Sequence, residues 1–417
     1  MTMTPGGGPD FPAERATAVA QLGTSPRRTL YRGRNPKRAA TIEDLRAMAH
    51  RRLPRFALEY LEAGAGDEAA LAGNLAAFYR WRFLPRALVD VRQRDLGRTL
   101  FGRRLPLPLL VAPTGLNGVF RKDADRLLAL GAARMGVPFA QSTMSNNSIE
   151  DVAATAGLHH WFQLYVIDPP EITDDLITRA ESAGCEALIV TTDAQTFGKR
   201  SWDIRGRVKP SILTLREVID AGLHVRWWST TLLPRGLPRF ANLQRWFPKD
   251  KQGLFESAFW TRDHMDVGLD WDRAARIRDR WPRKLLIKGL LTAEDVARAQ
   301  AAGADGAILS NHGGRQLDWV AAPLDMLPAA RAAVGAGFPL LVDGGVRSGG
   351  DIVKAIALGA DAVLVGRAPL YGVASAGEAG VIRAIEILRD EADLTLALLG
   401  CARIDALDRR FLVEEPG

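Results

Sequence analysis

Eight short apolar runs, separated by helical patterns, constrain the fold of this chain more than any other feature. The runs are continuous rather than alternating, as is typical of parallel strands that are buried on both faces. Such strands, alternating with helices, predict an α/β fold in which a closed (β/α)8 TIM barrel is favoured over an open doubly wound sheet. The runs are Pro108–Ala112, Val137–Ala140, Trp161–Tyr165, Ala187–Thr192, Lys284–Lys288, Gly306–Ser310, Pro339–Asp343 and Ala362–Gly366.

The segments between these runs begin and end with recurring helix signals. Ser148–Asp151 and Thr292–Asp295 resemble capping boxes, in which the first side chain accepts the backbone N–H of the last residue. Ala183–Glu186, Ala302–Asp305 and Leu358–Asp361 each place a glycine directly before the next strand. Because glycine suits the conformation that ends many helices, these three sequences indicate one repeated helix-to-strand joint.

The ends of the chain differ in character. Residues 1–40 contain the run Pro5–Pro9 and scattered arginines, and predict a flexible basic leader. Residues 41–417 are expected to form a single barrel domain. This domain begins with an N-terminal helical extension, in which Thr41 caps a first helix and residues 56–79 continue the helical pattern.

One connection breaks the regular alternation. About 90 residues separate the fourth strand, which ends near Asp193, from the fifth, which begins near Lys284. They predict a long insertion after strand four, at about residues 206–268, and long insertions are often functional. Within it, residues 224–248 interleave Trp and Arg with Leu, as in a segment that lies on an anionic membrane face without spanning it. The alternative is a lid whose aromatic side chains pack onto the barrel mouth.

Composition excludes several classes of protein. The net charge is +7, but the arginines are spread along the chain without zinc-finger spacing or a basic-helix motif, so neither nucleic acid nor a metal is an expected partner. The two cysteines, Cys185 and Cys401, indicate no disulfide framework, and Cys185 is expected to be buried. No signal-peptide pattern and no run near the roughly 18 apolar residues of a spanning helix occur. A cytoplasmic location is expected, with peripheral contact at the inner face of the cell membrane through the insertion.

Polar residues stand at nearly every strand end, which is where barrel enzymes carry out their chemistry. After the sixth run, His312 and Arg315 share a glycine-bearing loop, Ser310–Asp318. A base beside a fixed cation is what the oxidation of a hydroxy acid needs, since one group takes a proton and the other holds a carboxylate. The loops after strands seven and eight, with Asp343–Gly349 and Gly366–Arg367, predict a phosphate site.

These motifs resemble those of the FMN-dependent α-hydroxy-acid dehydrogenases and oxidases. The resemblance runs from about residue 41 to 405, and the loop Ser310–Asp318 is its most specific part. Residues 113–118 and 161–167 are most similar to the branch that oxidises (S)-mandelate, with the L-lactate dehydrogenases next. The resemblance implies FMN as cofactor, oxidation of an (S)-2-hydroxy acid with a bulky or aromatic side chain, a quinone or another electron acceptor, and a homo-oligomer, often a tetramer.

The resemblance also implies roles for individual residues. His312 would accept the proton and Asp193 would stabilise the resulting imidazolium. Arg200, Arg315 and Tyr60 would bind the substrate carboxylate, and Tyr165 the substrate oxygen. Lys288 would lie against the N1–O2 edge of the flavin. The remaining predicted cofactor contacts are Pro113, Thr114, Gly115, Ser142, Gln163, Thr191 and Ser310 around the ring and ribityl chain, and Asp343, Gly344, Gly345, Arg347, Gly366 and Arg367 towards the phosphate.

Two positions depart from the oxidase pattern. Gly115 stands where glycolate oxidases carry Ala, which favours a dehydrogenase, and Met144 stands where they carry Trp, which suggests room for a larger substrate. Three alternatives remain open: an L-lactate dehydrogenase on the same scaffold, a soluble oxidase that uses O2, and a flavin-binding module without catalysis. Intact His312, Arg200 and Arg315 argue against the last.

Overall fold

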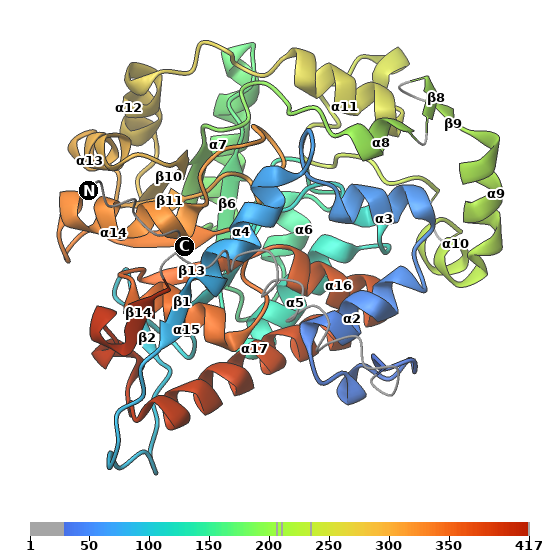
Figure 1. Cartoon of the computed structure of the whole chain (residues 1–417). Coiled ribbons are helices and arrows are strands. Elements are labelled where there is room, and N and C mark those ends of the chain that lie inside the picture. The colour runs from blue at the N-terminus through green and yellow to red at the C-terminus, as the bar shows by residue number, and fades with distance from the viewer. Residues whose placement is uncertain (1–28, 206, 210–211, 234–235, 416–417) are drawn as a thin grey trace, which may run out of the picture.

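A closed barrel of eight parallel strands forms the centre of the protein (Figure 1). The computed structural model describes residues 29–205, 207–209, 212–233 and 236–415. The predicted (β/α)8 TIM barrel is confirmed, and no strand limit differs from its prediction by more than two residues. Around the barrel the strands are β4 (Leu109–Val111), β5 (Phe139–Ser142), β6 (His160–Leu164), β7 (Ala187–Thr191), β10 (Lys284–Leu290), β11 (Gly306–Leu309), β12 (Leu340–Asp343) and β13 (Ala362–Val365).

The strands are apolar on both faces because each face packs against something different. Inward side chains such as Leu110, Ile189 and Leu341 fill the barrel itself. The hairpin of β2 (Arg98–Leu100) and β3 (Arg103–Leu105) adds Leu100 and Leu105 to this inner cluster. Outward side chains pack against the surrounding helices in a second, larger cluster. Continuous apolar runs are therefore required here, as expected of parallel strands.

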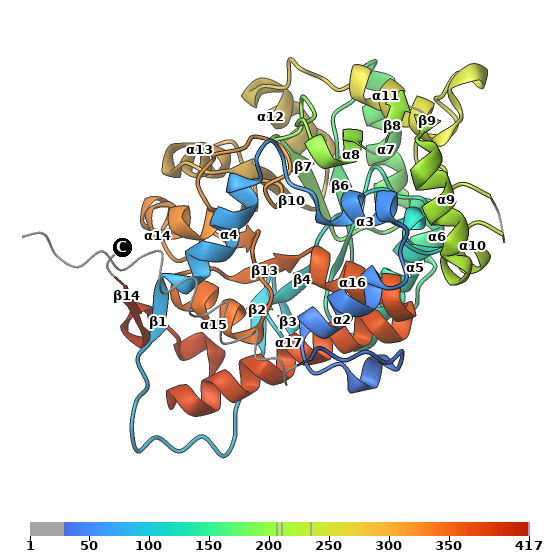
Figure 2. The same ribbon diagram turned by 45° about the vertical axis from the view of Figure 1, so that its right-hand side comes forward.

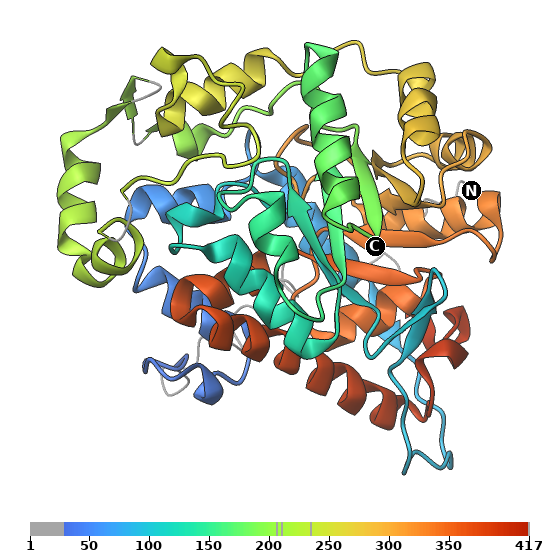
Figure 3. The ribbon, with the colours of Figure 1, turned by 180° about the vertical axis from the view of Figure 1, so that it is seen from behind.

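Helices cover the outside of the barrel (Figures 1 and 3). The predicted capping at Ser148 and Thr292 is confirmed, since each side chain accepts the backbone N–H three residues on. These helices are α5 (Ala124–Met135), α6 (Ile149–Ala153), α7 (Pro170–Ser182), α12 (Trp271–Arg280), α13 (Ala293–Ala301), α14 (Pro323–Val334), α15 (Gly349–Ala357), α16 (Arg367–Ala376) and α17 (Glu378–Leu399).

The N-terminal helical extension is also present. It comprises α2 (Ile42–His50), α3 (Arg55–Glu62) and α4 (Ala69–Tyr79), and Thr41 caps α2 in a capping box. Of the predicted leader, residues 1–28 lie outside the described residues, whereas residues 29–40 pack against the domain: Ala39 is buried and its carbonyl accepts from Arg383. The packed part of the chain therefore begins earlier than residue 41. After α4, the short strand β1 (Trp81–Phe83) pairs with β14 (Leu412–Glu414), which lies near the C-terminus.

The insertion after β7 gathers along one side of the molecule (Figure 2). Its elements are α8 (Ser201–Arg205), β8 (Arg207–Lys209), β9 (Ile212–Leu213), α9 (Leu215–Leu223), α10 (Val225–Thr231) and α11 (Leu254–Asp263). Within 224–248 the aromatic side chains turn inward: Trp227 and Phe247 are buried, and Trp227 donates to the Val119 carbonyl at 2.7 Å. That part of the segment thus follows the alternative in which its aromatics pack onto the barrel. In the described part of the chain, no helix is long and apolar enough to cross a membrane.

The repeated helix-to-strand joint has a clear physical function. The Asp305 carboxylate accepts the backbone N–H of Leu285, near the start of the neighbouring strand, at 3.0 Å. The Asp361 carboxylate accepts the N–H of Leu340 at 2.9 Å, and also binds Arg331 at 2.6 Å. Each Asp therefore accepts a backbone N–H near the start of a strand, where the neighbouring strand offers no carbonyl as acceptor.

We predict that Asp361→Ala lowers the free energy of unfolding by about 2–3 kcal/mol, because the Leu340 N–H and the Arg331 guanidinium both lose an acceptor. Asp361→Asn, which keeps an acceptor oxygen, should lose less. Urea denaturation measures the change. Asp390→Ala, which removes an exposed carboxylate paired with its neighbour Arg389, is the control and should change stability by less than about 0.5 kcal/mol. Equal losses in the Asp361→Ala and control variants would contradict the assigned role.

Candidate active site

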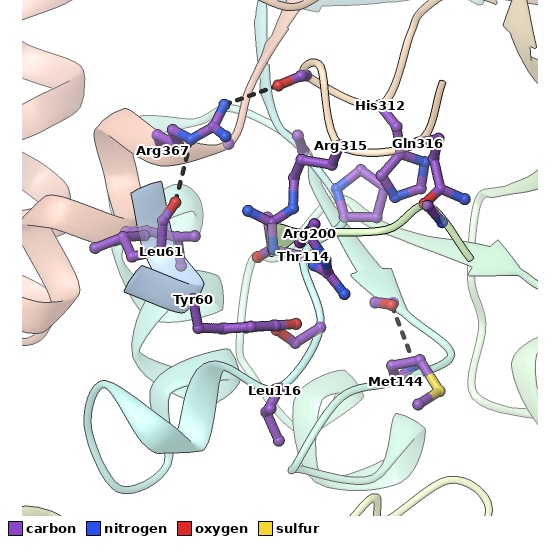
Figure 4. Close-up of a pocket in the computed structure, with 18 of the residues that line it drawn as sticks. Tyr60, Leu61, Thr114, Leu116, Met144, Arg200, His312, Arg315, Gln316 and Arg367 are labelled. Atoms are coloured by element: carbon purple, nitrogen blue, oxygen red, sulfur yellow. Dashed lines mark hydrogen bonds between the residues drawn. The ribbon is translucent and has the colours of Figure 1, made fainter. Parts of the chain in front are cut away.

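A cavity of about 530 Å³ opens at the carboxyl ends of the barrel strands (Figure 4). Sixteen of the twenty predicted site residues line it: Tyr60, Pro113, Thr114, Gly115, Ser142, Tyr165, Arg200, Lys288, His312, Arg315, Asp343, Gly344, Gly345, Arg347, Gly366 and Arg367. The other four are Asp193, Gln163, Thr191 and Ser310. Three of these bond to lining residues: Asp193 to His312, Gln163 to Ser142, and Ser310 to Lys288.

His312 is held between an acid and a phenol. Its Nδ1 lies 2.9 Å from Asp193 Oδ1, and its Nε2 lies 3.3 Å from the Tyr165 hydroxyl. His312 itself has a left-handed backbone, with φ of 59°, and its N–H donates to Ser310 Oγ at 3.0 Å. A non-glycine residue held in this region is uncommon and is found mostly where the position of a side chain matters.

Asp193 carries its charge although it is buried. Burial alone raises the pKa of this carboxyl, but the His312 imidazole and the Lys288 ammonium outweigh that effect and hold the pKa below its ordinary value. An ionised Asp193 accepts a hydrogen bond from Nδ1–H and so leaves Nε2 of a neutral imidazole as an acceptor facing the cavity. The geometry thus prepares His312 Nε2 to take a proton.

Lys288 is a buried cation with a well-defined set of partners. Its Nζ donates to Ser310 Oγ at 2.8 Å and lies 3.2 Å from Asp343 Oδ2, while Ser310 Oγ donates to Asp343 Oδ1 at 2.7 Å. Burial lowers the pKa of Lys288, but the Asp343 and Asp193 carboxylates more than compensate, so the net shift is upward. A fixed positive charge therefore lies at the cavity wall.

Two arginines face the same aromatic ring. The guanidinium carbons of Arg315 and Arg200 lie 5.1 Å and 5.4 Å from the centroid of the Tyr60 ring. Arg315 also donates to the Ala63 carbonyl at 2.8 Å. Figure 4 shows Tyr60, Arg200, Arg315 and His312 around one opening. Paired guanidinium groups beside a phenol are suited to binding a carboxylate.

Arg367 marks a second anion site in the same cavity. Within the described residues its hydrogen bonds go to backbone carbonyls, those of Leu61, Glu62, Ala63 and Gly313. Burial, followed by the repulsion from Arg315 and Arg347, lowers its pKa to about 9. A cluster of cations that repel one another becomes favourable when a multiply charged anion binds between them.

The backbone beside Arg367 is shaped for close approach. Gly344 and Gly345 have φ of 99° and 89°, in the region that favours glycine. A Cβ atom on Gly345 would lie 2.2 Å from the Asn74 carbonyl oxygen, so no larger residue fits. This glycine turn precedes α15 and lies in the loop that commonly binds phosphate in barrels of this type.

Buried polar atoms at three strand ends have no hydrogen-bond partner in the described part of the protein. They are Thr114 Oγ1, Gln163 Nε2 and Thr191 Oγ1. Such groups cost free energy unless a ligand or water satisfies them. A flat ring with polar edges, attached to a phosphate, would satisfy these atoms and the arginine cluster together. The barrel mouth therefore suits an enzyme that holds a small organic acid beside a phosphorylated cofactor.

Comparison with known proteins gives the family. The model of the FMN-dependent dehydrogenases matches residues 49–414, and the chain belongs to that family. It is 44% identical over 375 residues to the (S)-mandelate dehydrogenase of Pseudomonas putida, covering 90% of this chain and 94% of that protein. It is 40% identical to a putative L-lactate dehydrogenase of Mycobacterium tuberculosis, covering 90% of this chain and 89% of that protein.

A solved structure is similar over most of the chain. It is described as the crystal structure of the monotopic membrane protein (S)-mandelate dehydrogenase. Its TM-score is 0.86 at 43% identity, and the match covers 91% of this chain and 100% of that one. The cofactor is FMN, as the family requires, and the unpartnered strand-end atoms and the arginine cluster fit its ring and its phosphate.

Part of the cavity wall could not be predicted from the sequence. The cavity is also lined by Ile204 of α8 and by Leu254, Phe255 and Phe259 of α11. They come from the insertion, where no motif indicated which side chains turn inward. The contact between Asn74 and Asn311 was not predicted either: their amides bond reciprocally at 2.8 Å and 2.7 Å and connect the His312 loop to α4. The signal for it was a polar residue in the apolar α4 sequence.

We predict that Arg367→Met weakens FMN binding about tenfold to a hundredfold, because it removes a charge-assisted contact to the phosphate. Titration of the apoprotein, followed by quenching of flavin fluorescence, measures the Kd. Arg367→Lys should bind more tightly than Arg367→Met, since it keeps the charge. Arg410→Met is the control, because it changes an exposed arginine that forms an ion pair with Asp408. An unchanged Kd in Arg367→Met would remove Arg367 from the phosphate site.

Proposed function

We propose that this protein oxidises an (S)-2-hydroxy acid with a bulky or aromatic side chain, such as (S)-mandelate, to the 2-oxo acid. The observation that carries the proposal is the position of His312 Nε2, which faces the cavity with Asp193 behind it and the arginine pair beside it. Met144 and Phe197 line the same cavity, and Gly115 adds no side chain, which supports an aromatic substituent. The names of the similar proteins support the substrate class.

Each residue has a distinct task in this proposal. Arg200, Arg315 and Tyr60 bind the carboxylate, and Tyr165 binds the oxygen on the reacting carbon. His312 Nε2 takes a proton, from the hydroxyl if hydride transfer operates or from the α-carbon if a carbanion forms. Asp193 stabilises the imidazolium. FMN, when bound, accepts the two electrons. The Lys288 ammonium lies at the cavity wall, where it would balance negative charge on the reduced cofactor.

The same base and arginine pair would also serve L-lactate. The 40% identity to a putative L-lactate dehydrogenase favours this substrate as the second candidate. An oxidase that passes electrons to O2 is the third, and the release of peroxide under air would identify it.

We predict that (S)-mandelate bleaches the flavin absorbance of the anaerobic holoenzyme rapidly, and that (R)-mandelate, L-lactate and glycolate do so slowly or not at all. Stopped-flow absorbance measures the rate. His312→Gln should keep the flavin and lose most of the rate, about a hundredfold or more, since general-base catalysis is removed. Rapid bleaching by L-lactate would favour the second candidate. Full activity in His312→Gln would be incompatible with the base assignment.

Helix α9 of the insertion supports a peripheral membrane location, because its apolar face points outward and its polar face points toward the protein. On α9, Leu215, Val218, Ile219 and Leu223 form one stripe and are 53–76% exposed. The opposite, polar face turns inward: Glu217 is buried, and Asp220 accepts the backbone N–H of Arg55 at the start of α3, at 2.6 Å. A surface helix ordinarily buries its apolar stripe, so α9 is suited to an apolar environment outside the protein.

We therefore place the proposed contact on α9 rather than on the tryptophans of 224–248. From that segment only Val225, Leu233 and Leu237, among the described residues, add large exposed apolar side chains. The exposed arginines Arg216 and Arg226 flank the stripe, as in helices that lie in the interface of an anionic membrane. A similar structure is described as a monotopic membrane protein, which supports peripheral contact with a membrane. The inner face of the cell membrane as the location, and a membrane quinone as the electron acceptor, are part of the same proposal.

We also propose a homo-oligomer, a tetramer by resemblance to the family. A second exposed apolar surface, on the far side from α9, supports a subunit contact. It contains Leu88 on the arm between β1 and β2, and Leu394 and Leu398 on α17. Arg94 on the arm and Asp393 on α17 form an ion pair at 2.5 Å and hold these parts together.

We predict that Ile219→Glu with Leu223→Glu lowers binding to vesicles of phosphatidylcholine and phosphatidylglycerol by at least about a hundredfold, because charged side chains replace apolar ones at the interface. Co-sedimentation measures the bound fraction, and anaerobic flavin bleaching should be unchanged. Leu84→Glu with Val413→Glu, beside the β1–β14 pair, is the matched control, since both side chains are exposed and lie outside the two proposed contacts. Undiminished vesicle binding by the α9 variant would exclude α9 as the contact.

A further inference from the structure

The cavity has two kinds of wall outside the cofactor contacts. One wall is basic and carries Arg200 and Arg315, which suit a carboxylate. The other is apolar and comes from the insertion, with Ile204 of α8 and Phe255 and Phe259 of α11. A small hydroxy acid held by the arginine pair uses the first wall. The second wall is not among the contacts proposed for that acid, whose substituent is assigned to Met144 and Phe197.

The apolar wall runs from the buried site to the protein surface. At the inner end, Met144 and Tyr165 are each 8% exposed. At the outer end, Ile204 lines the cavity and is also 52% exposed, and Trp202 in the same helix is 38% exposed. Ile204 therefore belongs both to the cavity and to the outer surface.

The outer end of this wall lies on the same side of the molecule as the exposed stripe of α9. The short strands β8 and β9 separate α8 from α9 in the chain, and Figures 1 and 2 show α11, α8 and α9 along the same side of the molecule. Arg205 stacks on the Trp202 ring, with its guanidinium carbon 4.1 Å from the centroid. Exposed apolar side chains thus lie on α9 and on α8, and Ile204 of α8 also lines the cavity.

We infer that Ile204, Phe255 and Phe259 form the docking wall for a lipophilic electron acceptor, a quinone that enters from the membrane beside α9. This rests on the proposed function, in which the protein lies on a membrane and a quinone accepts the electrons. The hydroxy acid loses two electrons and two protons to become the 2-oxo acid. The quinone gains two electrons and two protons and leaves as the quinol.

A polar acceptor would not need such a wall. Ferricyanide is a hydrated anion that gains nothing from apolar contact, whereas a quinone ring and its first isoprenoid unit are desolvated against Ile204 and the two phenylalanines. Comparing reoxidation by the two acceptors therefore distinguishes an effect of the wall on acceptor binding from an effect on reduction of the flavin by the hydroxy acid.

In the test, the holoenzyme is first reduced anaerobically with (S)-mandelate and is then mixed with either ubiquinone-1 or ferricyanide. Detergent micelles are present throughout, so that membrane binding is not needed. Stopped-flow absorbance gives the rate constant of flavin reoxidation for each acceptor. In Ile204→Gln, the ratio of the ubiquinone-1 rate to the ferricyanide rate should fall about fivefold to tenfold, because one apolar contact is lost. Phe259→Gln should lower the ratio similarly. Val413→Gln, a similarly exposed apolar residue on β14, is the matched control and should keep the wild-type ratio.

Three outcomes would overturn the inference, and they are distinguishable. An unchanged ratio in both wall variants would show that the acceptor does not use this wall. Slower bleaching by (S)-mandelate with an unchanged ratio would assign the wall to the substrate. If ubiquinone-1 does not reoxidise the wild-type enzyme, while O2 does so and releases peroxide, the proposed acceptor itself is wrong. A lower ratio with normal bleaching supports the inference.

Discussion

The arrangement of the site depends on keeping one buried carboxylate, Asp193, ionised. Burial works against this charge, and the His312 imidazole and the Lys288 ammonium outweigh it. Asp193 follows β7, Lys288 lies in β10, and His312 follows β11, so three consecutive strands of the barrel position the interacting groups. Moving any one strand relative to the others would leave a buried charge without its partner, which is costly. The closed barrel fixes these positions because every strand has two neighbours.

The N-terminal extension links the two anion sites. Arg315 and Arg367 both donate to the Ala63 carbonyl, and Arg367 also donates to those of Leu61 and Glu62. These carbonyls belong to the C-terminal end of α3, where a helix leaves acceptors unsatisfied and carries partial negative charge. The same helix carries Tyr60 beside the arginine pair. One helix end therefore supports both the proposed carboxylate contact and the proposed phosphate contact.

The insertion joins the active site to the outer surface. It packs its large aromatic side chains inward, as Trp227 shows, and leaves the stripe of α9 exposed. Its helices α8 and α11 also complete the cavity wall. Because all of these elements belong to the one connection between β7 and β10, the proposed membrane contact and the proposed entry of the acceptor share a single segment.

The sequence by itself determined the barrel and most of the site. Strands buried on both faces must be continuously apolar, and helices must end in recognisable joints, so these patterns are local and can be read from the chain. His312, Arg315 and the glycine turn at Gly344 and Gly345 were recognisable because they follow strands in a motif of fixed spacing. Cys185 is buried, as its position before a strand indicated.

Only the tertiary structure decided how the residues of the insertion are oriented. Trp and Arg interleaved with Leu are compatible with either a membrane face or an inward-packing lid, because composition does not say which side of a helix meets the protein. On α9 the polar face turns inward because Arg55 and its backbone N–H lie opposite it, contacts that are distant in the chain. Likewise, no local pattern could indicate that Ile204 and Phe259 line the cavity, since that follows from packing across the mouth of the barrel.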